Sequence, residues 1–304
     1  MRTLLLRRLV RVLVVIAGVS LITFGILHAS GDPVALMMPE APEADRVKLR
    51  AEMGFDDPLA VQFGRFLWNT VRGDFGRSFY HRAPALDLVL ERMPTTMTLT
   101  LLALAVAVAV SIPAGIYSAV RRDSLADHLV TVVVFLGQSM PVFWTGIMLM
   151  LLFAVHWRVV PVSGWDGWQF MILPAVTLGI FQAPLLLRIV RSSMLEALGL
   201  DYVRTARSKG VSEWLVIWRH ALTNAALPLV TVMGIQFGIL LGGAVVTETV
   251  FAVPGVGRLI VRGIQQLDFP VVQAGVFVLA MIVVVLNFAV DMLYTYLNPQ
   301  IRYR

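Results

Sequence analysis

The sequence contains no cysteine among its 304 residues. That absence excludes disulfide bonds, cysteine-ligated metal sites and thiol nucleophiles. Lysine is nearly absent too: Lys48 and Lys209 are the only two, and neither lies in a Gly-x-x-x-x-Gly-Lys-Ser/Thr phosphate-binding loop. The five histidines show no pair at the spacing of metal ligands on one helix face. We therefore expect no bound metal and no ATP site of this kind on the chain.

Charged residues are also scarce, at 14% of the sequence, whereas 58% of the residues are hydrophobic. Soluble domains reach roughly 45–50% apolar residues even when glycine is counted. The mean hydropathy of +0.79 points the same way. The composition excludes an ordinary soluble domain and predicts an integral membrane protein.

Six uncharged runs, each long enough to cross a hydrocarbon core, interrupt the charged segments. Since no strand-like alternation is present and backbone polar groups in lipid must be satisfied within the segment, each run is predicted to be a helix. The prediction is an all-α membrane protein with six transmembrane helices at 12–31, 93–120, 128–157, 167–187, 221–247 and 269–290.

The Lys and Arg residues predict the orientation. The N-terminus, 121–127, 188–220 and the C-terminus together hold 14 of them, whereas the short loops of the opposite set hold only Arg158, Arg258 and Arg262. Because basic residues gather in cytoplasmic loops, both termini are predicted to be cytoplasmic.

The first 31 residues are interpreted as a cytoplasmic N-terminus and an uncleaved first helix. A signal peptide is the alternative, although the apolar run exceeds the usual 7–15 residues. Residues 32–92 are then an extracytoplasmic insert of short helices, or a passive spacer, and residues 93–304 form the core transmembrane domain.

The segment 192–227, between the fourth and fifth runs, carries ordered helix signals. Asp201 is placed to cap a short helix running from Tyr202 to about Lys209, and Gly210 suits a left-handed residue after it. A second amphipathic helix is predicted to start at Ser212 and to stop before Pro228. These signals favour a rigid knob that seats in a partner, but topology and attraction to anionic lipid also explain a basic loop.

Seven sequence motifs give the chain a specific resemblance. DYVRTARSKG at 201–210 and RHALTNAALP at 219–228 are joined by GDP at 31–33, GDFGRSF at 73–79, SMPVFWTG at 139–146, ETVFAVPGVGRL at 248–259 and LDFP at 267–270. Taken in their order along the chain, the motifs resemble those of permease subunits of ATP-binding-cassette importers, in the dipeptide, oligopeptide and nickel group. The resemblance covers effectively the whole chain.

The resemblance implies the type I importer permease fold, in which a coupling helix between the fourth and fifth spans docks in a groove of a cytoplasmic ATPase. It places Asp201, Tyr202, Arg204, Thr205, Ala206, Arg207, Lys209, Gly210, Arg219, His220, Asn224 and Pro228 in that coupling loop. The general importer loop begins Glu-Ala-Ala, whereas Arg204, Thr205 and Ala206 stand here, which fits the peptide and nickel branch.

The resemblance also implies the partners: a second homologous permease in a heterodimer, two ATPase subunits that hold ATP and Mg, and an extracytoplasmic substrate-binding protein. It implies a bacterial inner membrane location and no cofactor on this chain. Peptide is the expected solute, with a nickel or other metal chelate, or glutathione, as alternatives.

Within the fifth run, Gly234, Gly238 and Gly242 recur every four residues and form a small face on which another helix can approach closely. Gln236 lies on roughly the opposite side of the helix. One hypothesis is that the glycine face packs while Gln236 borders a polar path; the alternative is that Gln236 only hydrogen-bonds within the bundle.

The segment after the fifth run carries turn formers. By resemblance it lies outside, where Glu248, Phe251, Pro254, Gly255 and Gly257 are candidates for contacting the binding protein or gating the outer mouth; a simple surface turn is the alternative.

Two other classes of protein remain open. An ATP-independent secondary transporter needs coupling carboxylates near the midplane or an inverted repeat, but Glu248 and Asp291 lie near the ends of their runs and no repeat is evident. An intramembrane enzyme needs a nucleophile, a metal or an acid–base cluster, and none is found.

Overall fold

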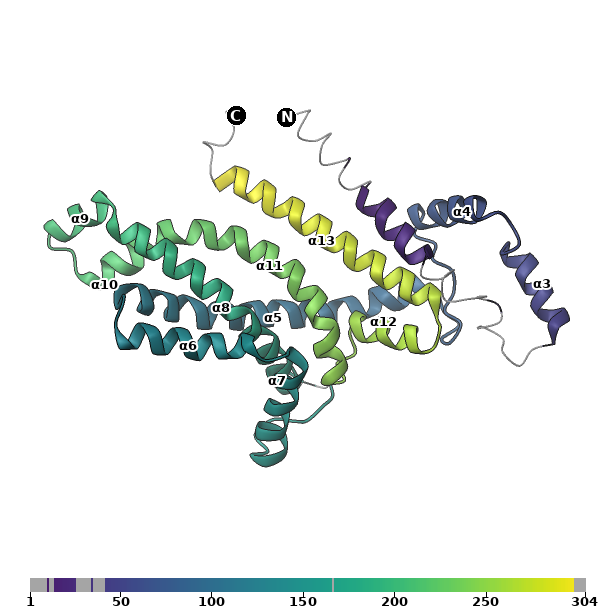
Figure 1. Ribbon diagram of the computed structural model, residues 1–304, viewed down its shortest axis with the longest axis horizontal. Helices are drawn as coiled ribbons and strands as arrows, with labels where there is room; N and C mark the ends of the chain where they lie inside the picture. The colour runs from purple at the N-terminus through teal and green to yellow at the C-terminus, as the bar shows by residue number, and fades with distance from the viewer. Residues whose placement is uncertain (1–9, 11–13, 26–33, 35–41, 166, 298–304) are drawn as a thin grey trace. The chain divides into compact units, whose positions relative to one another are not determined.

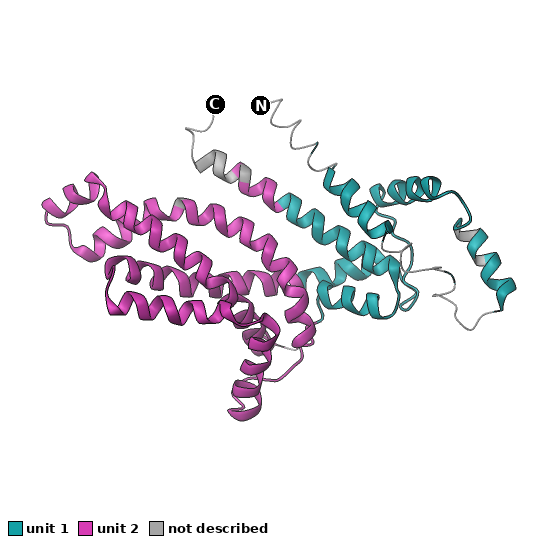
Figure 2. Cartoon of the chain, viewed as in Figure 1, with its two compact units in different colours: residues 1–94, 254–285 teal, residues 95–253, 286–304 magenta. Residues whose placement is uncertain are grey.

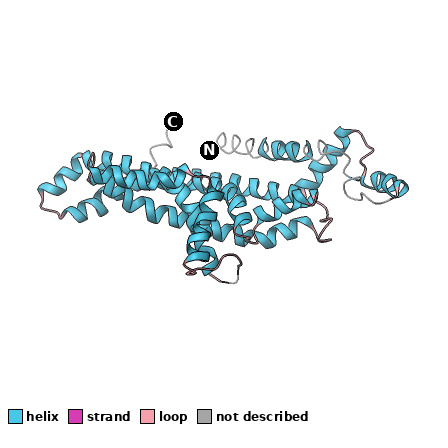
Figure 3. Ribbon diagram, turned by 60° about the horizontal axis from the view of Figure 1, so that its bottom comes forward, coloured by secondary structure: helices cyan, strands magenta, loops and turns pink. Residues whose placement is uncertain are grey.

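The computed structural model describes residue 10, residues 14–25, residue 34, residues 42–165 and residues 167–297. Figures 1 and 3 show helices joined by loops, with no strand among the described residues beyond an isolated bridge between Arg77 and Pro84. The helices are α3 (Glu43–Met53), α4 (Leu59–Val71), α5 (Ala85–Val120), α6 (Leu125–Ser139), α7 (Val142–Leu149), η1 (Met150–His156), α8 (Gln169–Gly199), α9 (Asp201–Ser208), α10 (Glu213–Leu215), η2 (Val216–Ala221), α11 (Leu222–Val250), α12 (Val256–Gln265) and α13 (Phe269–Leu297). The all-α prediction is confirmed for these residues.

Four helical stretches are long and apolar enough to cross a membrane: Ala85–Val120, Gln169–Gly199, Pro228–Val250 and Phe269–Val290. A fifth crossing is available if α6 and the α7–η1 helix count as one span. The first predicted span, 12–31, lies partly outside the described residues, which show an apolar helix only at Val14–Gly25. The prediction of membrane-crossing apolar helices is therefore confirmed, but the number six is not.

The predicted span 128–157 is not one straight helix. The chain bends by 103° between Ser139 and Val142, and Met140 is extended, with φ −108° and ψ 144°. Met140 precedes Pro141, and a residue before proline is disfavoured from the helical region. The bend therefore has a local cause in the sequence.

Two helices extend beyond the uncharged runs that predicted them. α5 begins at Ala85, eight residues before the run that starts at 93, and α8 continues to Gly199, twelve residues past the run that ends at 187. Charged residues limit the part of a helix that lies in lipid, but the helix itself can continue beyond them. The predicted short helices of the insert are confirmed as α3 and α4.

The chain divides into two compact units, residues 1–94 with 254–285 and residues 95–253 with 286–304 (Figure 2). The core of unit 1 joins Phe75 and Val89 to residues of α12 and α13, and the Phe75 and Phe277 rings are centred 5.3 Å apart. In unit 2, α8 is the central helix, since a row of its side chains is at most 1% exposed: Leu178, Leu186, Leu187, Val190 and Met194.

Candidate functional site

The segment predicted to be a coupling loop forms one end of unit 2. α9 follows α8 after a single residue, and α10, η2 and α11 then return along unit 2 (Figure 1). Leu200 is that residue: it ends α8 and begins α9, with extended backbone at φ −78° and ψ 153°. The predicted helix from Tyr202 to about Lys209 is confirmed within one residue at each end.

The cap predicted at Asp201 is wrong by one position. Leu200 occupies the cap and offers no side-chain hydrogen bond, while Asp201 is the first helical residue. An acid there still favours the helix, because the first turn carries the positive end of the helix dipole. The Asp201 carbonyl also accepts the Thr205 hydroxyl at 2.9 Å.

The C-terminal end of α9 matches the prediction and is more fully capped than expected. Gly210 adopts φ +76°, and its N–H donates to the Arg207 carbonyl at 3.0 Å. The Val211 N–H donates to the Ala206 carbonyl at 3.2 Å, which completes a Schellman cap. Because a Cβ at Gly210 meets nothing within 4 Å, the glycine is required by backbone conformation and not by space.

α9 presents two chemically distinct faces. Val203 is fully buried and Ala206 is 8% exposed, and both pack with Val216 of η2. The remaining coupling candidates of α9 and its cap are exposed: Asp201, Tyr202, Arg204, Thr205, Arg207, Lys209 and Gly210. The apolar face of α9 thus holds the helix against the end of unit 2, and its opposite, mostly basic face is exposed.

An ion pair joins the exposed side of α9 to α10. The Arg207 guanidinium donates to both carboxylate oxygens of Glu213, at 2.6 Å and 3.1 Å. This bond lowers the pKa of the Glu213 carboxyl and raises the pKa of Arg207. Both side chains are about half exposed, so the pair fixes geometry more than it adds stability.

The second predicted helix starts where expected but does not stop before Pro228. Ser212 precedes α10, and the helix then continues through the π-helical turn η2 and through Pro228 to Val250. Proline costs a backbone bond and a clash inside a helix. Here Ala225 and Leu229 are both buried in the core of unit 2, and that packing outweighs the local penalty.

The remaining coupling candidates lie on η2 and the start of α11. Asn224 donates its side-chain N–H to the His220 carbonyl at 3.1 Å, and the Tyr202 hydroxyl reaches the same oxygen at 3.5 Å. Arg219, Asn224 and Pro228 are exposed, whereas His220 is half-buried. The structure therefore brings α9 and η2 together.

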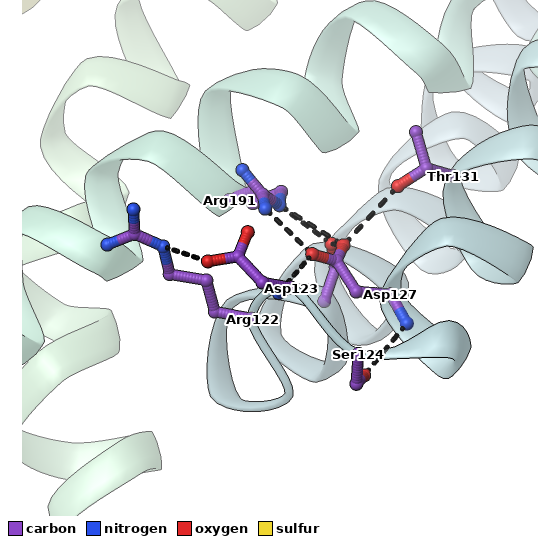
Figure 4. Close-up of polar contacts among 7 residues, drawn as sticks. Arg122, Asp123, Ser124, Asp127, Thr131 and Arg191 are labelled. Carbon is purple, nitrogen blue, oxygen red and sulfur yellow. Dashed lines mark hydrogen bonds and ion pairs between the residues drawn. The ribbon is translucent and has the colours of Figure 1, made fainter.

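Sequence reasoning missed a buried ion pair at this end of unit 2. Asp127 is 2% exposed, and its carboxylate accepts from the Arg191 guanidinium at 2.7 Å (Figure 4). It also accepts from the Ser118 hydroxyl. The Arg191 Nε also donates to the Ser118 hydroxyl oxygen at 2.9 Å. This Asp127 cluster ties α5, α6 and α8 together. In the sequence, Asp127 and Arg191 stand just outside two apolar runs. Such charges were used there only to set the ends of the runs, and the two were not paired.

The glycine face of α11 packs at one of its ends only. A Cβ on Gly234 would lie 2.0 Å from Cγ2 of Val290 in α13, whereas one on Gly242 would meet nothing within 4 Å. Gly238, between them, is half-buried. Gln236 is 5% exposed, and both interpretations of its role stay predictions.

The predicted outer-contact residues are mostly inside the protein. Glu248 is fully buried and accepts the Thr96 hydroxyl at 2.6 Å, and Phe251 is 2% exposed. Gly255 and Gly257 are buried and Pro254 is half-buried. The expected turn is present at 251–255 and leads into α12 at Val256, but it is packed against the protein and not exposed on the surface. Burial does not fit a surface contact, and the accessible side chains of α12 are Arg262, Ile264 and Gln265.

Two features named in the sequence analysis cannot be placed in the structure. Asp291 and the GDP at 31–33 lie among residues whose side chains or backbone fall outside the described part of the chain. Across the described residues, no group of three or more His, Cys, Asp or Glu could hold a metal ion.

Comparison with protein families and curated proteins shows what the chain resembles. The model of the binding-protein-dependent transport system inner membrane component matches residues 111–303, and the model of its N-terminal region matches residues 1–100. The dipeptide transport system permease protein DppB of Escherichia coli K12 is 40% identical over 99% of this chain and 98% of its own. The glutathione transport system permease protein GsiC of the same strain is 40% identical over 98% of each.

Solved structures show the same fold at lower identity. The MetNI methionine ABC transporter, in an inward-facing conformation, matches with a TM-score of 0.60 and 19% identity over 69% of this chain and 96% of that chain. An amino acid ABC transporter crystallised with histidines matches with a TM-score of 0.50 and 15% identity over 70% and 94% of the two chains.

Proposed function

Because the chain belongs to the family of binding-protein-dependent transport system inner membrane components, as a permease of ATP-binding-cassette importers, we propose that it carries peptides across the bacterial inner membrane. Its 40% identity over nearly full length to a dipeptide permease and a glutathione permease supports a short peptide as the solute. Glutathione, itself a tripeptide, is the second candidate, and a nickel or other metal chelate is a further alternative.

One structural observation carries the coupling role. α9 is a rigid element closed by a Schellman cap, buried through Val203 and Ala206, with a basic surface turned outward. A surface of this kind suits a groove on a partner ATPase. We propose that its exposed residues dock there and that ATP and Mg bind on the ATPase subunits.

The connections of α9 determine what its displacement does. Leu200 joins it directly to α8, and η2, which packs on α9, continues into α11. A push on α9 therefore reaches two spans of unit 2. The Asp127 cluster extends the connection to α5 and α6, so these helices move as one body when the ATPases close.

The remaining partners follow from the same proposal. A second homologous permease completes the pathway as a heterodimer, and an extracytoplasmic binding protein delivers the peptide. Both termini are then cytoplasmic, and α3 and α4 lie outside.

Affinity purification of the tagged chain from its native membrane tests this proposal. Wild type is expected to bring down two ATPases and a second permease. Arg204→Glu changes an exposed α9 residue, whose side chain is 74% exposed, and is expected to lose the ATPases alone. Lys48→Glu, an equal charge reversal on exposed α3, is the control and should behave as wild type.

Two results contradict the proposal. If the wild-type chain purifies alone, or as a homodimer, the proposed importer assembly is wrong and an ATP-independent transporter is favoured. Retention of the ATPases by both Arg204→Glu and Gly210→Pro removes the coupling role from α9.

A further inference from the structure

Unit 1 contains a cavity of about 790 Å³ that the coupling mechanism does not use. Its walls come from Phe24 in the helix 14–25, the turn at Gly54 and Phe55, α4, the loop 75–82 and the start of α13. The volume falls within the roughly 300–1,000 Å³ typical of small-molecule sites.

The loop that forms one wall is anchored to α13. Asp268, 1% exposed, accepts the Ser78 hydroxyl at 2.5 Å and the Phe79 N–H at 3.2 Å. These bonds join the GDFGRSF and LDFP motifs, which are about 190 residues apart in sequence. The cavity is therefore built by long-range contacts that hold its walls in place.

The cavity combines aromatic walls with cations at its rim. Phe55, Phe66, Phe75, Phe79 and Phe269 contribute rings. Arg65, Arg77 and Arg82 are exposed among the lining residues, and no carboxylate is among those lining residues. Arg65 pairs with Asp57 outside the lining, at 2.6 Å.

The other two arginines are held by the loop itself. Arg77 donates to the Arg82 carbonyl at 2.8 Å, and neither forms an ion pair within the described part of the chain. Guanidinium groups in this state bind carboxylates through paired hydrogen bonds. Asp268, the acid that anchors this loop, already accepts bonds on both its oxygens.

A buried donor without an acceptor points to a ligand. Gln273, one helical turn after Phe269 on α13, lines the cavity and is 8% exposed. Its amide nitrogen is buried and meets no acceptor among the described residues. Buried polar groups are rarely left in this state. A carbonyl oxygen of a ligand in the cavity would satisfy it.

From these observations we propose that the cavity of unit 1 binds the carboxyl-terminal end of a peptide. Arg77 and Arg82 bind the terminal carboxylate, the phenylalanines contact an apolar side chain, and Gln273 donates to a peptide carbonyl. This inference rests on the proposed function, and it adds a subsite on the permease itself, on the side where the binding protein delivers its peptide.

Photolabelling of the assembled importer in nanodiscs tests the subsite. The probe is alanyl-p-benzoylphenylalanine with a free carboxyl group, compared with the same dipeptide as its C-terminal amide. The acid is expected to label peptides from 73–82 or 269–273, and the amide to label them about tenfold less, since it lacks the charge that both arginines bind. The double variant Arg77→Ala/Arg82→Ala should lose about tenfold of the acid's labelling.

Two variants sharpen the test. Gln273→Leu keeps the volume and removes the donor, and should weaken labelling by both acid and amide. Arg72→Ala is the matched control, because Arg72 is an exposed arginine of the same region that stacks on Trp68 and does not line the cavity. Its labelling should equal that of wild type.

The subsite is overturned if acid and amide label equally, if the double variant labels as wild type, or if a photoreactive fatty acid labels the cavity and the dipeptide does not displace it. ATP-driven uptake of a radiolabelled dipeptide is measured on the same preparations. Uptake without labelling overturns the subsite alone, whereas absence of any peptide uptake by wild type overturns the proposed function.

Discussion

Replacing Arg191 by methionine would remove the guanidinium from the Asp127 cluster and leave a carboxylate that is only 2% exposed. Removal of one partner from a buried ion pair costs about 3–5 kcal/mol, because an uncompensated charge stays behind. The Arg191 side chain is 30% exposed, so water can enter the vacated space. The Ser118 hydroxyl and the Asp123 N–H also still donate to Asp127. We therefore expect the lower end, about 3 kcal/mol.

The assay is unfolding of the purified chain in mixed micelles by added dodecyl sulfate, followed by the fluorescence of its seven tryptophans. Arg188→Met is the matched control, since Arg188 lies on the same helix, is exposed and forms no ion pair in the described structure. Its cost should remain within about 0.5 kcal/mol.

A double-mutant cycle separates the ion pair from other effects of the substitution. Asp127→Asn/Arg191→Met should cost at least about 1 kcal/mol less than the sum of its two single variants, since the double variant carries no unpaired charge. Additivity within about 0.5 kcal/mol, or a loss below about 1 kcal/mol for Arg191→Met, would refute the reasoning.

Three further predictions concern local features. Gly234→Ala should lower the free energy of unfolding by about 1–3 kcal/mol, because the new methyl group overlaps a valine of α13; Gly242→Ala, eight residues on, should be nearly neutral in the same assay. Gly210→Ala should weaken α9 by about 1–2 kcal/mol through its left-handed backbone, read as faster hydrogen exchange of the α9 amides, and Gly210→Asn should restore part of the protection. The lowered pKa of Glu213 means that its bond to Arg207 stabilises α9 fully above the ordinary carboxyl pKa of about 4.3 and loses that effect as the pH falls through the lowered value. The difference in exchange between wild type and Glu213→Gln should thus be present at neutral pH, amount to no more than about 1 kcal/mol, and disappear in acid; a difference that grows on acidification would contradict this sign.

Local signals predicted α9 well because the residues that set its start and its end lie within the helix or directly beside it. The left-handed glycine, the basic last turn and the first-turn acid act through neighbouring backbone groups. The shift of the cap from Asp201 to Leu200 is the kind of one-residue error that helix ends produce. The bend after Met140 also has a local cause in Pro141, but the prediction of one span over 128–157 did not use it.

Features that depend on distant contacts were not accessible to the same reasoning. Asp127 and Arg191 are 64 residues apart, and only the packing of α6 on α8 brings them together. Pro228 lies inside a helix because Ala225 and Leu229 are buried on either side of it. The burial of Glu248 likewise depends on α5, which supplies Thr96.

The single residue between α8 and α9 has a mechanical consequence. A linker of several residues would absorb a displacement of α9 in its own dihedral angles, since each added residue contributes two rotatable backbone angles. Leu200 offers only its own φ and ψ, since its neighbours Gly199 and Asp201 are both helical. A torque on α9 thus turns α8 unless those two angles change. One glycine inserted after Leu200 should uncouple the two helices. The ATPases would still bind α9, but their closure would no longer move α8.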